Sequence, residues 1–259
     1  MQARIMSLLA VLTAAGFLGC GGGGGINVNI SGPSFPPFNP VQNTDFVASE
    51  PFESTLSSTN RLRLVLTGVN GMVAVTGMPA GGSVTISAER RVGSDSLADA
   101  QSHLSYLQVQ VQEVGNDIVV RTSQPPDPAG RSYQVDYQIG VPASFALSIV
   151  NTNGSIELTG MSGDVDTDLV NGSIEATLQV PAGGSIKMTT VNGGIDLHLP
   201  LSTSANLSAE VEVGTITVQD PLVPNEMRSN STLQHTLGAG GATVSLQTTT
   251  GSIRIDGVI

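Results

Sequence analysis

The sequence from Asn151 onward repeats one short motif, Asn153-Gly154-Ser155-Ile156-Glu157-Leu158. Close copies are Asn171-Gly172-Ser173-Ile174-Glu175-Ala176 and Asn192-Gly193-Gly194-Ile195-Asp196-Leu197, and weaker copies begin at Val213 and Thr250. The motif glycines lie 18, 21, 21 and 37 residues apart. A period near 20 residues is typical of stacked solenoid rungs. The repeat therefore predicts an all-β fold, a β-solenoid or β-helix of short strands.

Each copy alternates apolar and polar residues, which places Ile174 and Ala176 on one strand face and Glu175 on the other. The glycine can take a positive φ at a corner, where the preceding asparagine is also tolerated. A second series of glycine units lies between the copies, so each rung is expected to hold two short strands. Stacking at ~4.8 Å per layer would align two sets of residues, a buried isoleucine column and an amide ladder: Ile156, Ile174 and Ile195, and Asn153, Asn171 and Asn192.

The region 46–150 continues the same domain in this interpretation. Alternating residues predict strands over 61–66, 70–75, 82–86, 107–111 and 133–141. One short helix is expected over 94–104, with Ser94 or Ser96 as its N-cap, and with Leu97 and Ala100 on a shared face. The domain is therefore predicted to span 46–259 as a single unit.

The first nineteen residues have the features of an export signal. Arg4 supplies a basic start, and a short apolar run leads to Gly19 and Cys20, the single cysteine of the chain. The run is shorter than the ~20 residues that a membrane-spanning helix needs. The stretch resembles a bacterial lipoprotein signal, although Phe17 stands where that family usually has leucine. The resemblance implies cleavage after residue 19 and lipid attachment at Cys20.

A tether is expected over residues 20–45. Five glycines follow Cys20, and the segment stays rich in Gly, Pro, Asn and Ser. Such a composition cannot bury enough apolar surface to fold. In lipoproteins of this kind, aspartate after the cysteine favours the inner membrane. Gly21 stands there instead, so the resemblance implies an exported, membrane-anchored protein of the outer membrane or cell surface.

Composition narrows the classes of partner. Removal of Arg4 with the signal leaves 9 basic and 21 acidic residues, a net charge of −12. So acidic a chain has no electrostatic footprint for nucleic acid. With one cysteine it forms no internal disulfide. The partners expected are the membrane, through Cys20, and a protein or surface ligand that the sequence does not identify.

The order of these elements resembles a known family. A strand near Arg61, an Asn-Gly corner at Asn70, a short helix, a Tyr-x-Val-x-Tyr-x-Ile strand from Tyr133, and tandem Asn-Gly-Ser-Ile rungs are similar to the bacterial putative-adhesin domain family. The likeness covers residues 46–259. It implies a β-helical, exported protein and attachment at the cell surface, but no particular ligand.

Candidate chemistry is sparse. Asp164, Asp166 and Asp168 alternate on one strand face, a linear arrangement that suits calcium poorly. No basic residue lies near them in sequence, since Lys187 is the only lysine. The histidines are placed in the helix, on an outward strand face beside Asp196, and in a polar loop: His103, His198 and His235. None has metal or triad spacing, so the sequence predicts no catalytic, cofactor-binding or metal-binding residue and no enzyme.

Two further features bear on partners. Proteins usually bind sugars by stacking them on aromatic rings. The chain has no tryptophan, and its three tyrosines, Tyr106, Tyr133 and Tyr137, are expected to face the core, so a sugar-binding groove has little support. The final unit at Ser252 is expected to end the stack. It would be either covered by a loop over 220–240 or used for self-association by strand pairing.

Three functions fit these features. The first is a lipid-anchored, non-catalytic binding or adhesion module. The second is a structural or stress-sensing envelope component that faces the periplasm. The third, a carbohydrate-active enzyme on a β-helix, rests only on carboxylates such as Asp166.

Overall fold

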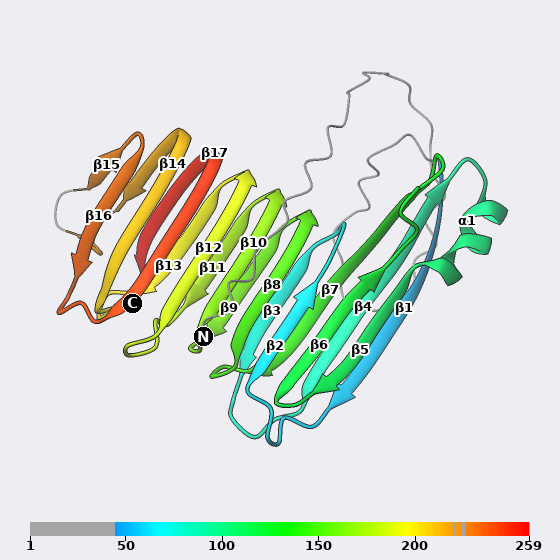
Figure 1. The fold of residues 1–259 in the computed structure, drawn as a ribbon, viewed down its shortest axis with the longest axis horizontal. Helices are drawn as coiled ribbons and strands as arrows, with labels where there is room; N and C mark the ends of the chain where they lie inside the picture. Colours follow the sequence, from blue (N-terminus) through cyan, green and yellow to red (C-terminus); the bar gives the residue numbers. More distant parts are fainter. Residues whose placement is uncertain (1–44, 220, 224–225, 259) are drawn as a thin grey trace, which may run out of the picture.

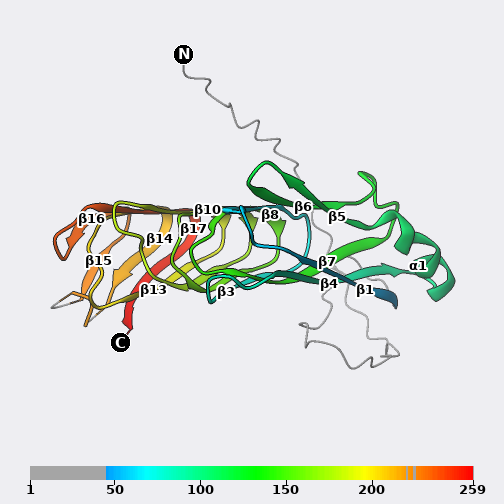
Figure 2. The same cartoon turned by 90° about the horizontal axis from the view of Figure 1, so that it is seen from below.

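The computed structural model describes residues 45–219, 221–223 and 226–258, whose seventeen strands form one continuous sheet (Figure 1). The sheet is folded into two layers that lie face to face (Figure 2), here called the upper and lower layers as that figure shows them. The predicted all-β architecture of stacked short strands is confirmed. The predicted signal (1–19) and nearly all of the tether (20–45) lie outside the described residues.

The upper layer is parallel in its middle and antiparallel at its ends. Its strands run in the order β5 (Gln108–Val114), β6 (Asp117–Ser123), β2 (Arg63–Thr67), β8 (Ala146–Asn153), β10 (Val165–Asn171), β12 (Ser185–Asn192), the first half of β17 (Ala242–Val258), the first half of β14 (Ala205–Val218) and β16 (Thr232–Leu237).

The lower layer follows the same plan. Its order is β1 (Phe46–Leu56), β4 (Val84–Ser94), β7 (Ser132–Pro142), β3 (Val73–Met78), β9 (Ile156–Met161), β11 (Ile174–Leu178), β13 (Ile195–Pro200), the second halves of β17 and β14, and β15 (Met227–Ser229).

Each repeat forms one rung, with one strand in each layer and a corner between them. Parallel pairing in register sets Ile174 directly beside Ile156 on one side and Ile195 on the other. All three side chains are at most 1% exposed. The predicted isoleucine column is therefore confirmed, and it forms part of one core that fills the space between the layers.

The corners depend on glycine for two reasons. The motif glycines have φ between 121° and 152°, a region that side chains disfavour. In addition, a Cβ on Gly172 would collide with the carbonyl oxygen of Gly154, and a Cβ on Gly193 with that of Gly172. The same contact links the glycines in the order Gly71, Gly154, Gly172, Gly193, Gly251 and Gly214. The rungs approach so closely at the corner that only a hydrogen fits.

The asparagines beside these glycines form the predicted amide ladder. The side-chain NH₂ of Asn171 donates to Oδ1 of Asn153 at 2.8 Å, and that of Asn192 donates to Oδ1 of Asn171 at 2.8 Å. The ladder extends one rung further, because Asn153 donates to Oδ1 of Asn70 at 2.7 Å. Among the described residues it ends at Asn192, since the next rung has Thr250 at this position.

The order of rungs in space differs from their order in the sequence. β17 lies between the rung of β12 and β13 and the rung of β14, and pairs in register along both of its edges. The expectation that the unit at Ser252 ends the stack is therefore wrong. Self-association by strand pairing at this rung would need a free edge, and both edges of β17 are already paired.

The segment over 220–240 is also more ordered than expected. Within its described part it contributes β15 and β16, which pair antiparallel with the two halves of β14. The loop prediction was wrong because proline and glycine at the ends of this segment masked two short strands. These strands cover β14, the rung that does end the stack.

The N-terminal part contains the five predicted strands and three more: β1, β6 and most of β8. β1 carries Pro51, which is tolerated because β1 is an edge strand with one partner, β4, among the described strands. The helix is shorter than predicted: α1 (Leu97–His103) continues as one 3₁₀ turn, η1 (Leu104–Tyr106). Ser96 is its N-cap. Ala100 is buried, but Leu97 is 45% exposed and does not share its face.

No helix in the described ranges is long and apolar enough to cross a membrane.

The isoleucine column gives a first prediction. Ile174→Asp buries an unpaired carboxylate and is expected to lower the free energy of unfolding by about 4 kcal/mol. Glu175→Ala, on the exposed side of the same strand, is expected to change it by less than about 0.5 kcal/mol. Urea unfolding of both variants measures the difference. Equal effects would contradict the inward and outward assignment.

The glycine corner gives a second prediction. Gly172→Ala must place a methyl group against the carbonyl of Gly154, and we expect a loss of at least about 3 kcal/mol. Gly183→Ala is the matched control, because Gly183 also has a positive φ of 70° but a Cβ there would have no atom within 4 Å. It should cost only about 1 kcal/mol of backbone strain. A similar loss for both variants in thermal unfolding would show that the corners are not closely packed.

Candidate functional site

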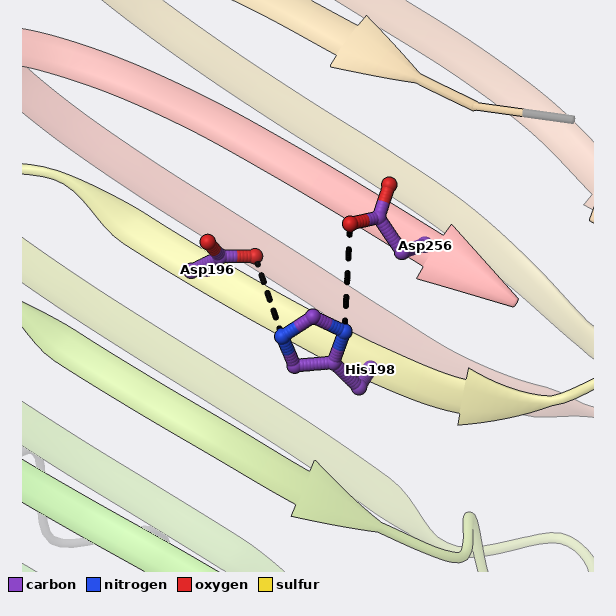
Figure 3. Close-up of side chains that lie close together, drawn as sticks. All are labelled: Asp196, His198 and Asp256. Carbon is purple, nitrogen blue, oxygen red and sulfur yellow. Dashed lines mark ion pairs between the residues drawn. The ribbon is translucent and has the colours of Figure 1, made fainter. Parts of the chain in front are cut away.

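Among the described residues, one group of three side chains has the spacing to hold a metal ion, and it lies on the outer face of the lower layer, where β13 and β17 are neighbours. Pairing sets Asp196 beside Arg254 and His198 beside Asp256. Figure 3 shows the imidazole of His198 between the two carboxylates. Asp256 is 58 residues from His198 in sequence, and the insertion of β17 beside β13 brings them together.

The distances describe a loose cluster. Nε2 of His198 lies 3.4 Å from Oδ1 of Asp196, and its Nδ1 lies 3.8 Å from Oδ2 of Asp256. Nε of Arg254 lies 2.8 Å from the same Oδ2 of Asp256. One ligand atom from each of the two aspartates and the histidine can be chosen so that all lie within 4.8 Å of one another. This is the spacing at which three side chains can share one ion.

The cluster is half-enclosed although it lies on an outer face. The parallel pairing of β14 with β17 continues one residue past Val218: the backbone N–H of Gln219 donates to the carbonyl of Ile255, and its side chain accepts from Arg254 at 3.1 Å. Asp256 is only 9% exposed.

This environment affects the acidity of Asp196. Loss of solvent raises the pKa of its carboxyl above the usual value, and the nearby carboxylates of Asp256 and Glu175 add to the rise. His198 and Arg254 act in the opposite direction but do not cancel it. The site thus disfavours the charge that Asp196 carries at neutral pH.

The predicted alternating face is confirmed for Asp166 and Asp168 on β10, and Asp164 lies just before that strand. No basic residue is near them in sequence, but one is near in space. Lys187 lies one rung away on β12, with Nζ 3.1 Å from Asp166 and 3.7 Å from Asp168. Sequence distance misled because 21 residues amount to one rung. Partial burial alone would lower the pKa of Lys187. The hydrogen bond to Asp166 and the charge of Asp168 have the larger combined effect, so the pKa is raised above its usual value. A lysine held protonated is unsuited to act as a base.

A row of carboxylates leads toward the cluster on the lower layer. Glu157, Glu175 and Asp196 are direct neighbours on β9, β11 and β13, as expected for the first two. Arg254 on β17 ends the row with a positive charge.

The remaining histidines lie elsewhere. His103 ends α1, with Nδ1 3.5 Å from a carboxylate oxygen of Asp99. The guanidinium of Arg131 holds the pKa of Asp99 well below its usual range, so this carboxylate already has a strong partner. His235, expected in a loop, lies in β16.

Two of the three tyrosines face the core as expected, and one does not. Tyr133 and Tyr137 are 3% and 1% exposed, and burial raises the pKa of Tyr137 to about 12. Tyr106 lies in the 3₁₀ turn and is 59% exposed. The period-two pattern that predicted it as a core residue does not hold in a helical turn.

Comparisons with known proteins add a family to this description. Residues 134–256 match the family model described as Toastrack DUF4097. This part of the chain is similar to the Toastrack family. The matched part contains every tandem rung and the Asp196–His198–Asp256 cluster, and the resemblance drawn from the Asn-Gly corners is confirmed.

One solved structure has a similar fold. A putative cell adhesion protein from Clostridium sporogenes covers 82% of this chain and 100% of its own, with 13% identity and a TM-score of 0.56. A putative adhesin from Bacteroides fragilis covers 83% and 99%, with 11% identity and a TM-score of 0.30, too low to carry an argument. No curated protein matches the chain. Lipid attachment at Cys20 lies outside the described residues and stays a prediction.

The environment of Asp196 gives a third prediction. A carboxyl whose folded pKa is raised binds its proton more tightly in the folded state, so its ionisation costs folding free energy as pH rises. Asp196→Asn removes that cost. We expect the variant to gain stability relative to the wild-type protein as pH rises above about 3.9, the usual pKa of an aspartate, and the gain to level off once Asp196 is ionised in the folded state. Urea unfolding with a chelator present measures this, and a variant that loses relative stability as pH rises would contradict the raised pKa.

Proposed function

We propose that this chain is a lipid-anchored protein of the cell envelope whose β-solenoid acts as a non-catalytic binding or adhesion module. The observation that carries the proposal is the distribution of side chains over the stack. Apolar residues of each rung fill the core, while the outer faces present polar residues in register from rung to rung. Stacked repeats of this kind offer extended surfaces to partners.

The outer faces supply chemistry for contact. Rows such as Glu157, Glu175 and Asp196 repeat one type of side chain at the spacing of the strands, about 4.8 Å. A partner with a matching repeat could bind across several rungs. Each single contact would have low affinity, but several contacts made together would give high affinity. The pairing of Lys187 with Asp166 and Asp168 supports a non-catalytic role for that face.

The N-terminal sequence supports the anchor. A basic start, a short apolar run and Gly19-Cys20 resemble a lipoprotein signal, and a glycine-rich stretch separates Cys20 from β1 at Phe46. The solved relative from Clostridium sporogenes is named a cell adhesion protein. That name agrees with a position at the cell surface.

Protease treatment of intact cells, with wild-type protein beside Cys20→Ala, tests the proposal. We expect external protease to remove the wild-type domain, because a lipid-anchored surface protein is accessible. We expect the variant to leave the membrane fraction, because Cys20 is the only cysteine available for lipid attachment.

Each part of the proposal can fail separately. A wild-type domain that is degraded only after the envelope is opened would place it in the periplasm and favour the structural or stress-sensing role. A Cys20→Ala variant that stays membrane-bound would contradict the anchor. A periplasmic marker protein, protected in the same cells, is the control for intact envelopes.

A further inference from the structure

The cluster of Asp196, His198 and Asp256 contains groups that the protein itself leaves without partners. Oδ1 of Asp196 and Oδ1 of Asp256 are both buried, and neither has a hydrogen-bond partner within the described part of the chain. Asp256 as a residue is 9% exposed. A buried carboxylate oxygen without a partner is costly, so it indicates a group that the protein atoms do not supply.

The imidazole cannot supply both partners. A neutral histidine carries one N–H, which can donate to one carboxylate, and its other nitrogen then presents a lone pair to the second. Figure 3 shows the ring nitrogens of His198 directed at different aspartates. With a neutral imidazole one of the two contacts is therefore repulsive, and either protonation of His198 or a bound cation removes that repulsion.

The charges of the surroundings point the same way. Two carboxylates face one guanidinium, that of Arg254, which contacts Oδ2 of Asp256 and not Asp196. Glu175 on β11 adds a further negative charge beside Asp196. With neutral His198, the group of Asp196, Asp256 and Arg254 retains an excess of one negative charge.

From these contacts we propose that Asp196, His198 and Asp256 bind a divalent transition-metal ion of the Zn²⁺ type. One imidazole nitrogen and two carboxylate oxygens are ligands that Zn²⁺ accepts at about 2.0–2.2 Å. Tetrahedral bonds of that length separate ligand atoms by roughly 3.3 Å. One nitrogen of His198 and one oxygen of each aspartate lie within 4.8 Å of one another, so the side chains must rotate to close around a single ion. Calcium fits less well because it prefers six to eight oxygens.

The ion would connect two rungs that are far apart in sequence. His198 and Asp196 come from β13 and Asp256 from β17, so the bound ion crosses the boundary between these strands. Three protein ligands leave a fourth position for water or for an acidic group of a partner. The proposal does not depend on the adhesion function.

Calorimetric titration with Zn²⁺ alone tests the site, using untagged full chain that carries Cys20→Ala to remove its only thiol. We expect one equivalent to bind and to raise the unfolding temperature. His198→Gln should weaken binding by at least about tenfold, because it removes the nitrogen ligand. Arg254→Gln should tighten binding, because it removes the cation that competes for Asp256.

His103→Gln is the matched control, since His103 also lies near an aspartate but belongs to no three-residue cluster among the described residues. It should bind Zn²⁺ as the parent does. Melting curves in chelator show whether each variant is folded. Failure of the parent to bind one equivalent, or equal affinity in the parent and folded His198→Gln, would overturn the proposal.

Discussion

The close approach of adjacent rungs at their glycine corners is the constraint on which the rest of the structure depends. At each corner, the carbonyl oxygen of one glycine lies where a Cβ of the next glycine would be. Neither rung can therefore slide relative to the other without a collision. The fixed register carries each side chain directly beside its counterpart in the next rung. The isoleucine column, the amide ladder and the row of carboxylates are three results of this single restriction.

That register explains why the sequence predicts the interior so well. The two-residue alternation specifies which side chains of Ile174-Glu175-Ala176 are buried, and the corner glycine specifies where the strands end. Both signals are local, so they can be read without knowing which rungs are neighbours. The N-terminal helix was harder to predict, because Leu97 and Tyr106 are exposed at an end of the domain where no further rung covers them.

The site was not predictable for a different reason. The sequence placed Asp196 and His198 correctly on an outward face, but it gave no sign of Asp256. Finding that residue requires the knowledge that β17 follows β13 in space, whereas β14 follows it in the chain. Lys187 and Asp166 show the same effect on a smaller scale: they are 21 residues apart and in contact. In a solenoid, residues one repeat period apart in sequence are neighbours in space. A strand inserted out of chain order, such as β17, places residues together that no multiple of the period relates.

The insertion of β17 also governs how the stack can be assembled. β14 is synthesised before β17, yet in the finished domain β17 occupies the space between β14 and the rung of β12 and β13. A chain that folds as it is synthesised can therefore stack its first rungs in order, but β14 reaches its final place only when the later strand β17 is added. Until then, two sheet edges stand open. Completion of the domain is a closing step, in which one late strand joins two parts that were made before it.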